Sequence, residues 1–179
     1  MSTDSGQEVF KTPRLRVRRI VHDDVDAMHR VYGDSEVVRW VGDGAPLDRD
    51  GCANWVEVTQ RNYSARGYGM FALVEHQSGE VVGFCGLVHP DGQQEAEIKY
   101  ALDRQWWGMG LATEAAAALL AYGSTEFGLT YVIATTAPEN TASHRVLLKA
   151  GMTRGRLRRN DDGSSTQLFE WRRADEQPA

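Results

Sequence analysis

The sequence predicts a single α/β domain built on a mixed β-sheet. The chain has 179 residues, a length that suits one hydrophobic core. Hydrophobic residues make up 41% and charged residues 25%, as in ordinary globular proteins. The hydrophobic periodicity changes between 2 and about 3.6 residues along the chain. The resulting order is a strand, two helices, three strands, a helix, a strand, a helix and two final strands.

The first part of the domain is predicted to contain one strand and two helices. Residues 14–20 alternate apolar and basic side chains, which is typical of a half-buried strand. Residues 22–32 begin with an acidic cap and keep helical spacing up to Gly33. Residues 34–46 are rich in Asp and Gly and are expected to be irregular. Residues 47–66 have the length and spacing of a second helix.

Three strands are predicted in the middle of the chain. Residues 70–74 and 80–88 are apolar, β-favouring runs, and the turn at residues 77–79 joins them into a hairpin. A second turn, at residues 90–92, contains Pro, Asp and Gly. Residues 96–102 follow as another strand.

The last part of the chain returns to alternating helices and strands. Residues 108–122 have helical spacing and an alanine run that lets a helix approach a sheet closely. Residues 129–136 form a β-branched, apolar strand, and residues 140–150 form a short helix that ends before a glycine. Residues 152–159 and 167–173 complete a hairpin.

Composition and charge exclude several classes of protein. The 25 acidic residues outnumber the 20 Lys and Arg residues, giving a formal charge of −5, which argues against nonspecific nucleic-acid binding. Residues 1–16 lack the apolar stretch of a signal peptide, and no apolar run approaches about 18 residues. We expect a cytoplasmic protein without nucleic-acid or membrane partners. Residues 1–11 are expected to be a flexible arm, residues 12–175 the domain and residues 176–179 a tail.

Cysteine and histidine usage points away from disulfides and metals. Cys52 and Cys85 lack the spacing of a disulfide framework or a zinc site, so we interpret both as buried free thiols. The five histidines show no metal-ligand spacing with one another. The sequence therefore predicts no bound metal.

The most informative segment is a strand that turns through a glycine-bearing loop into a helix, at residues 96–114. The first four amides of a helix have no acceptor within the helix and lie at the positive end of its dipole. Gly108 and Gly110 would let an anion approach these amides closely. The segment lacks the glycine pattern of dinucleotide-binding folds and the Lys-Ser/Thr of a nucleotide P-loop. It predicts a phosphate-binding turn of another kind.

Five stretches of the chain carry a resemblance to a known family. Residues 105–110 (QWWGMG) match the Q/R-x-x-G-x-G/A pattern of the GCN5-related N-acetyltransferase (GNAT) superfamily. Residues 97–102 (EIKYAL), 107–115 (WGMGLATEA), 140–152 (NTASHRVLLKAGM) and 12–18 (TPRLRVR) resemble motifs of its RimJ/RimL-type branch, in the expected order. The chain is identified as a member of this superfamily.

The resemblance implies a strongly twisted sheet of six to seven strands with about four helices, whose fourth and fifth strands splay apart around the pantetheine arm of acetyl-CoA. The backbone of residues 100–102 would bind pantetheine, and the amides of residues 105–110 would bind the pyrophosphate. Asn140 would contact pantetheine, Ser143 would lie near the thioester sulfur, and Arg145 or Lys149 would reach the adenosine 3′-phosphate. The implied residues that bind acetyl-CoA are Tyr100, Ala101, Leu102, Gln105, Trp106, Trp107, Gly108, Met109, Gly110, Leu111, Ala112, Asn140, Ser143 and Arg145.

The implied reaction is direct attack of a primary amine on the thioester. Glu97 is the candidate general base, acting through a water, and Ser143 is the candidate donor to the departing thiolate. A tyrosine that another branch uses as the acid is replaced here by Leu147. Lys99 stands where the RimJ/RimL-type branch usually has glycine, and in the acceptor channel it would repel cations. The acceptor is either a protein N-terminal α-amine or a small amine.

Simpler interpretations remain for each of these residues. The alternative interpretations are a solvated strand residue for Glu97, a packing hydroxyl for Ser143 and only a helix cap for Asn140. Of Trp106 and Trp107, one is expected in the core and the other over the loop. A non-catalytic acyl-CoA sensor or scaffold is the alternative function. A homodimer is compatible with the sequence, which does not define the oligomeric state.

Overall fold

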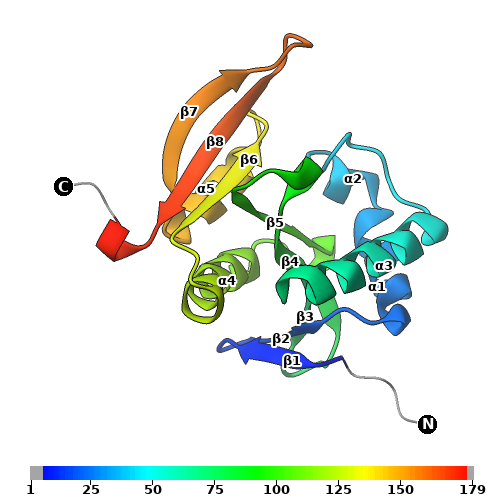
Figure 1. Cartoon of the computed structure of the whole chain (residues 1–179). Helices are drawn as coiled ribbons and strands as arrows, with labels where there is room; N and C mark the ends of the chain where they lie inside the picture. The colour runs from blue at the N-terminus through cyan, green and yellow to red at the C-terminus, as the bar shows by residue number, and fades with distance from the viewer. Residues whose placement is uncertain (1–5, 177–179) are drawn as a thin grey trace.

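The computed structural model describes residues 6–176 and places eight strands in one sheet, in the order β1-β2-β3-β4-β5-β6-β8-β7 (Figure 1). All neighbouring strands are antiparallel except β5 and β6, which are parallel. The strands are β1 (Glu8–Lys11), β2 (Leu15–Arg19), β3 (Met70–Glu75), β4 (Val81–Val88), β5 (Ala96–Leu102), β6 (Tyr131–Thr136), β7 (Thr153–Arg159) and β8 (Ser165–Arg172).

Helices cover both faces of the sheet. A first hydrophobic core lies between the sheet and helices α4 and α5, and a second lies between the sheet and helices α1 to α3. The α-helices are α1 (Val25–Tyr32), α2 (Ser35–Val38), α3 (Arg49–Arg66), α4 (Leu111–Phe127) and α5 (Thr141–Lys149). The short 3-10 helices are η1 (His22–Asp24), η2 (Pro90–Gly92), η3 (Arg104–Trp106) and η4 (Ala174–Glu176). Within residues 6–176, no helix is both long and apolar enough to cross a membrane.

The predicted α/β class and the order of its elements are confirmed. Two elements were not predicted, so the sheet has eight strands rather than six to seven, and there are five α-helices among the described residues rather than four. The first is β1, which occupies part of the expected arm at residues 1–11. The second is α2, in the segment expected to be irregular. The tail at residues 177–179 and the arm at residues 1–5 lie outside the described residues.

Local contacts explain both unpredicted elements. In β1, Phe10 pairs in register with Val17 and its ring lies 4.9 Å from the ring of Tyr122, so the arm gains backbone hydrogen bonds and an aromatic contact. At α2, the Asp34 carboxylate accepts the Glu36 N–H at 2.9 Å and caps the helix. These contacts depend on tertiary packing and on one polar cap, which weigh little in a periodicity analysis.

The parallel strands β5 and β6 separate soon after they meet. Only two residue pairs are in register, Ala96 with Val132 and Glu97 with Ile133. Beyond this point β5 stays paired with β4 as far as Leu102, and β6 stays paired with β8 as far as Thr136. The predicted splay of the fourth and fifth strands therefore lies between β5 and β6. We call this space the β5–β6 gap.

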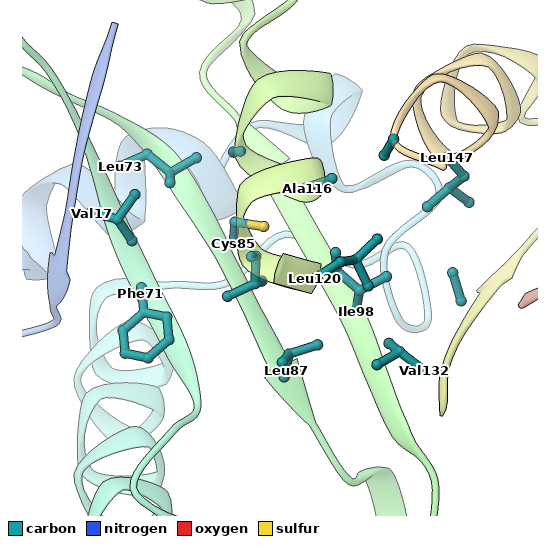
Figure 2. Close-up of a cluster of buried hydrophobic side chains, with 14 of the residues drawn as sticks. Val17, Phe71, Leu73, Cys85, Leu87, Ile98, Ala116, Leu120, Val132 and Leu147 are labelled. Carbon is teal, nitrogen blue, oxygen red and sulfur yellow. The ribbon is translucent and has the colours of Figure 1, made fainter. Parts of the chain in front are cut away.

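Helix α4 packs very close to the sheet. Figure 2 shows Ala116 and Leu120 of α4 beside Cys85 and Ile98 in the first core. A side-chain Cβ at Gly123 would lie only 2.8 Å from Leu87 Cδ1, so a larger residue there would have to displace the Leu87 side chain. The alanine run thus has the role predicted for it. The close packing fixes the start of α4, and with it the loop that precedes the helix.

We predict that breaking the buried ion pair between Arg18 and Asp24 strongly destabilises the protein. The Asp24 carboxylate accepts both guanidinium nitrogens of Arg18, at 2.7 and 2.8 Å, and the Val21 N–H at 2.9 Å. Both side chains are at least 92% buried. Asp24→Asn would remove the carboxylate charge that faces the buried Arg18 guanidinium, at a cost of about 3–5 kcal/mol in the free energy of unfolding. Urea denaturation would measure this change.

The control is Asp26→Asn, which breaks the exposed ion pair between Asp26 and Arg49. Exposed pairs contribute little, so this variant should unfold at nearly the wild-type urea concentration. Equal effects of the two substitutions would contradict the prediction.

Candidate functional site

The backbone of β5 is open toward the β5–β6 gap at every second residue. The Asp103 N–H donates to the Val82 carbonyl at 2.9 Å, and in an antiparallel pair hydrogen bonding alternates along the strand. Ala101 therefore turns its backbone toward β4, whereas Tyr100 and Leu102 turn theirs toward the gap. The predicted pantetheine contact fits Tyr100 and Leu102. It does not fit Ala101, whose amide and carbonyl are already paired in the sheet.

The loop between β5 and α4 is the predicted phosphate-binding turn. Gly108 and Gly110 have φ values of +74° and +78°, a conformation that favours glycine, and a Cβ at Gly108 would meet no atom within 4 Å. Gly110 is the N-cap of α4 and offers no side chain to the first amides. Among the described residues, the N–H groups of residues 111–113 have no acceptor. They are free to bind an anion.

The positive φ angles also correct the start of the helix, which was predicted at residue 108 and lies at Leu111. Most of the predicted loop residues are accessible. Gln105, Trp107, Gly108, Met109 and Gly110 are exposed, Trp106 and Ala112 are partly buried, and Leu111 is buried.

The two tryptophans of the loop have different environments, as predicted. Trp106 packs against the first core, and its indole N–H is buried with no partner among the described residues. Trp107 is half-exposed, and its indole N–H donates to the Leu102 carbonyl at 2.9 Å. Trp107 therefore ties the loop to the end of β5. It also engages a carbonyl that was predicted to bind pantetheine, which leaves the Leu102 N–H for that contact.

A brace from the N-terminal part of the domain holds the loop and the first turn of α4. The Arg14 guanidinium donates to the Met109 carbonyl at 2.6 Å and to the Glu114 carboxylate at 2.7 Å. Glu114 also accepts the Arg14 N–H at 2.8 Å and the Thr12 hydroxyl at 2.6 Å. Although burial opposes it, these bonds lower the pKa of Glu114 below its usual value. The brace explains why residues 12–14 belong to the site.

Glu97 is a buried carboxylate with both oxygens engaged. Its side chain is only 4% exposed, so it is not the solvated strand residue of the simpler interpretation. One oxygen accepts the Thr135 hydroxyl and forms an ion pair with Lys99, and the other accepts Gln93 Nε2 at 3.2 Å. Lys99 Nζ also lies 3.4 Å from the Thr135 hydroxyl oxygen. The carboxylate is thereby fixed at the edge of the β5–β6 gap.

Ser143 and Tyr100 form a hydroxyl pair near the same gap. Their oxygens are 2.6 Å apart, linking α5 to β5. Asn140 caps α5 by accepting the Ser143 N–H at 3.2 Å, as the simpler interpretation of Asn140 predicts. Burial raises the pKa of Tyr100 well above its usual value, so this hydroxyl stays protonated at neutral pH.

The carboxylate and the hydroxyl pair lie on opposite faces of the sheet. Successive strand side chains point to opposite faces, so Glu97 and Lys99 share one face while Ile98 and Tyr100 share the other. Ile98 belongs to the core under α4 and α5, which assigns Tyr100 and Ser143 to that face. Glu97 therefore lies on the face of the second core. The β5–β6 gap therefore has the Glu97 carboxylate on one face and the Tyr100–Ser143 hydroxyl pair on the other.

The remaining predicted residues are also placed. Arg145 and Lys149 are exposed on α5, and Leu147 is buried. Cys52 and Cys85 are buried free thiols, as predicted, and burial raises the pKa of Cys85 to about 12. Within residues 6–176, no group of three His, Cys, Asp or Glu side chains is arranged to hold a metal ion.

Sequence reasoning missed several residues of the site. The Tyr100 side chain was overlooked because only its backbone was considered, although a tyrosine in the strand before a phosphate loop could have been noticed. The importance of Arg14 and Glu114 could have been predicted, because both belong to the matched motifs at residues 12–18 and 107–115. No sequence pattern indicated Gln93 and Thr135, because their contacts with Glu97 arise only when the segment between β4 and β5, and strand β6, pack beside β5.

Comparisons with known proteins give one consistent result. The family described as acetyltransferase (GNAT) domain matches residues 14–153. The chain is 33% identical over 144 residues to the uncharacterized protein YkkB of Bacillus subtilis (strain 168), covering 79% of this chain and 83% of that protein. It is 28% identical over 165 residues to the uncharacterized N-acetyltransferase p20 of Bacillus licheniformis, covering 91% and 92% of the two chains.

Solved structures share the fold. The acetyltransferase (GNAT family) from Bacillus anthracis has a TM-score of 0.78 and 28% identity, covering 90% of this chain and 96% of that one. RimL, a ribosomal L7/L12 alpha-N-protein acetyltransferase solved with coenzyme A, has a TM-score of 0.79 over 93% of this chain and 98% of its own. Its identity of 16% makes this a likeness of fold alone.

The fold and the comparisons together define an acyltransferase. More particularly, the chain belongs to the acetyltransferase (GNAT) family, with N-acetyltransferase as the activity of that family and acetyl-CoA as its acetyl donor.

We predict that the Arg14 brace supports binding of the pyrophosphate. Arg14→Ala would free the Met109 carbonyl and the Glu114 carboxylate, loosening the loop whose amides face the anion. The dissociation constant for acetyl-CoA should rise about 10-fold, equivalent to about 1.4 kcal/mol. Isothermal titration calorimetry would measure this change.

S-acetylpantetheine, which lacks the pyrophosphate, should bind wild type and variant equally. Arg16→Ala is the matched control, because it removes a nearby arginine without removing a contact to Met109 or Glu114. An equal loss for both ligands would show that Arg14 supports the fold in general and would contradict the prediction.

Proposed function

We propose that the protein transfers the acetyl group of acetyl-CoA to a primary amine by direct attack, and that it belongs to the RimJ/RimL-type branch. The acceptor is a protein N-terminal α-amine or a small amine. The observation that carries the proposal is the position of Glu97 and of the Tyr100–Ser143 pair on opposite faces of the β5–β6 gap. A thioester in the gap would have a base on one side and hydrogen-bond donors on the other.

Acetyl-CoA fits the groups that surround the gap. Pantetheine would lie along β5 like an added strand, bonding the backbone of Tyr100 and Leu102. The pyrophosphate would bind the free amides at the start of α4, where a Cβ at Gly108 meets nothing. Asn140 would contact the pantetheine arm. Either Arg145 or Lys149, both exposed on α5, would meet the adenosine 3′-phosphate.

The acceptor side of the reaction rests on Glu97. An amine must be neutral to attack, and α-amines lose their proton more readily than lysine side chains, with pKa values of ~7.7–8.0 against ~10.4. Glu97 would take the proton through a water. The nitrogen then bonds to the acetyl carbon, and the carbon–sulfur bond breaks with its electron pair leaving on sulfur.

The departing thiolate needs a donor, and the hydroxyl pair supplies one. Tyr100 is protonated at neutral pH, as an ordinary tyrosine is, and burial raises its pKa further. It lies 2.6 Å from the Ser143 hydroxyl, so either group can donate to sulfur while the other supports it. This arrangement extends the role predicted for Ser143 to a second residue. Leu147, where another branch has its acid, is buried and has no proton to give.

The branch assignment rests on sequence motifs. The strand, loop and helix motifs at residues 97–102, 107–115 and 140–152 follow the RimJ/RimL pattern. The fold of RimL is shared as well. RimL acts on the α-amine of a ribosomal protein, which keeps an N-terminal α-amine among the candidate acceptors.

The direct test of the proposed function is a product analysis. The protein is incubated with acetyl-CoA and separate sets of N-terminal peptides, lysine peptides, amino acids, polyamines and aminoglycosides, and the products are examined by mass spectrometry. We expect acetylation of one class of amine together with release of coenzyme A. Tight binding of acetyl-CoA without any acetylated amine would contradict the proposal and favour the acyl-CoA sensor.

We predict that Glu97→Gln lowers kcat/KM at pH 7 about 100-fold, because general base catalysis contributes roughly 10²–10⁴-fold. The loss should shrink at pH 9, where the amine loses its proton unaided. Initial rates of coenzyme A release at both pH values would measure this effect. Glu95→Gln, which alters an exposed carboxylate two residues away, is the control. The same loss at both pH values would mean that Glu97 only orients the acceptor.

We predict that Tyr100→Phe lowers kcat about 10-fold or more while the affinity for acetyl-CoA is kept. The variant removes a donor to the thiolate but leaves the strand backbone that binds pantetheine. Single-turnover kinetics with saturating acetyl-CoA would measure the chemical step. An unchanged kcat in both Tyr100→Phe and Ser143→Ala would overturn the assignment of this pair.

A further inference from the structure

The face of the sheet that carries Glu97 also carries a partly exposed ammonium, that of Lys99. Glu97 and Ile133 are in register, so the side chains of Glu97, Lys99 and Thr135 lie on one face of β5 and β6. Thr135 is in register with Leu168 of β8, and this face therefore continues across the β5–β6 gap onto β8. We call it the acceptor face.

Lys99 is the charged group that lies next to the candidate base on this face. Its ammonium contacts Glu97 and lies 3.4 Å from the Thr135 hydroxyl. The Lys99 side chain is 42% exposed, whereas that of Glu97 is 4% exposed. An acceptor that approaches from solvent therefore meets the ammonium before it meets the carboxylate.

The other charged groups of the acceptor face offset one another. Glu170, in register with Ile133, is paired with Arg172 at 3.6 Å. Arg158, in register with Thr166 on the same side of β8, and Glu95, two residues before Glu97, are both exposed and form no ion pair with the described residues. Lys99 is therefore distinguished by its position beside Glu97 and not by an excess of positive charge on the face.

We infer that Lys99 selects acceptors whose reacting amine lies next to a carboxylate, as in a free α-amino acid. This inference rests on the proposed function and names its substrate class. A cationic amine meets the exposed ammonium of Lys99 before the buried carboxylate of Glu97, and the neutral pair as a whole does not attract it. An ammonium has three N–H donors, and two of those of Lys99 are directed to Glu97 and Thr135. The third, on the exposed side, is available to an anion.

Binding of a carboxylate to Lys99 also changes Glu97. The acceptor carboxylate competes with Glu97 for the same ammonium, so the Glu97 oxygen that accepts Lys99 becomes available to the water that carries the amine proton. The amine lies a single carbon away from the carboxylate and is directed toward the gap. The acceptor therefore frees the base that it needs, which a neutral amide of the same amino acid does not do.

The test compares amino acids with their α-carboxamides. The wild-type protein and Lys99→Gln are assayed with acetyl-CoA and each of the common amino acids, each matching carboxamide, and spermidine as a cationic amine. For the best acceptor we expect wild-type kcat/KM to be at least 10-fold higher for the acid than for the amide. Lys99→Gln should lose this preference by lowering the rate with the acid. Glutamine keeps a hydrogen-bond donor for Glu97, so the variant should fold.

Two further variants and one binding measurement complete the test. Lys99→Arg should keep the preference because it keeps the charge, and Lys11→Gln, which removes an exposed lysine on β1, should leave it unchanged. The affinity for acetyl-CoA should be the same in all variants. If spermidine or the amides react as fast as the acids, or if Lys99→Gln keeps the preference, the inference is wrong while the proposed function stands. If none of these amines is acetylated but an N-terminal peptide is, the inference is wrong and the proposed function stands; if no peptide is acetylated either, both fail.

Discussion

The early end of hydrogen bonding between β5 and β6 is the constraint on which the rest of the site depends. Beyond this point β5 is still paired with β4, and β6 is still paired with β8. The sheet is therefore continuous although it opens between β5 and β6. An open strand edge inside a fold needs a partner for its backbone groups. In the proposed function that partner is pantetheine. Helices α4 and α5 hold the two halves together through one core that includes Ile98, Ala116 and Leu147 (Figure 2).

Side-chain contacts fix the position of the open edge of β5 relative to the free amides at the start of α4. The Trp107 indole ties the loop to the end of β5. Arg14 and Thr12, which are far from the loop in sequence, bind Met109 and Glu114. The amides themselves keep no internal acceptor. The loop is thus fixed through its carbonyls and side chains, which leaves its N–H groups for an anion.

The sequence predicted most of the fold because strands and helices of this length have clear periodicity. Residues 96–102 form β5 with the predicted bounds, and the glycines of the loop lie where the phosphate-binding turn was expected. What could not be predicted depends on contacts between distant segments. Phe10 gives β1 its place only by packing on Tyr122, and Thr135 reaches Glu97 only because β6 begins beside β5. The direction of backbone hydrogen bonds, which separates Ala101 from Tyr100 and Leu102, requires the pairing of β5 with β4.

In the proposed function, the amine attacks directly and no covalent enzyme intermediate forms. A thiol route would need a thiolate near the thioester, and Cys85 is in register with Tyr100 beside the gap. Burial raises the pKa of Cys85 to about 12, so its thiol is protonated at neutral pH. Glu97 lies on the other face of the sheet and cannot take that proton. In the proposed function, the amine would come from the side of Glu97 while the thiolate leaves on the side of Tyr100 and Ser143, which is the geometry of a single displacement.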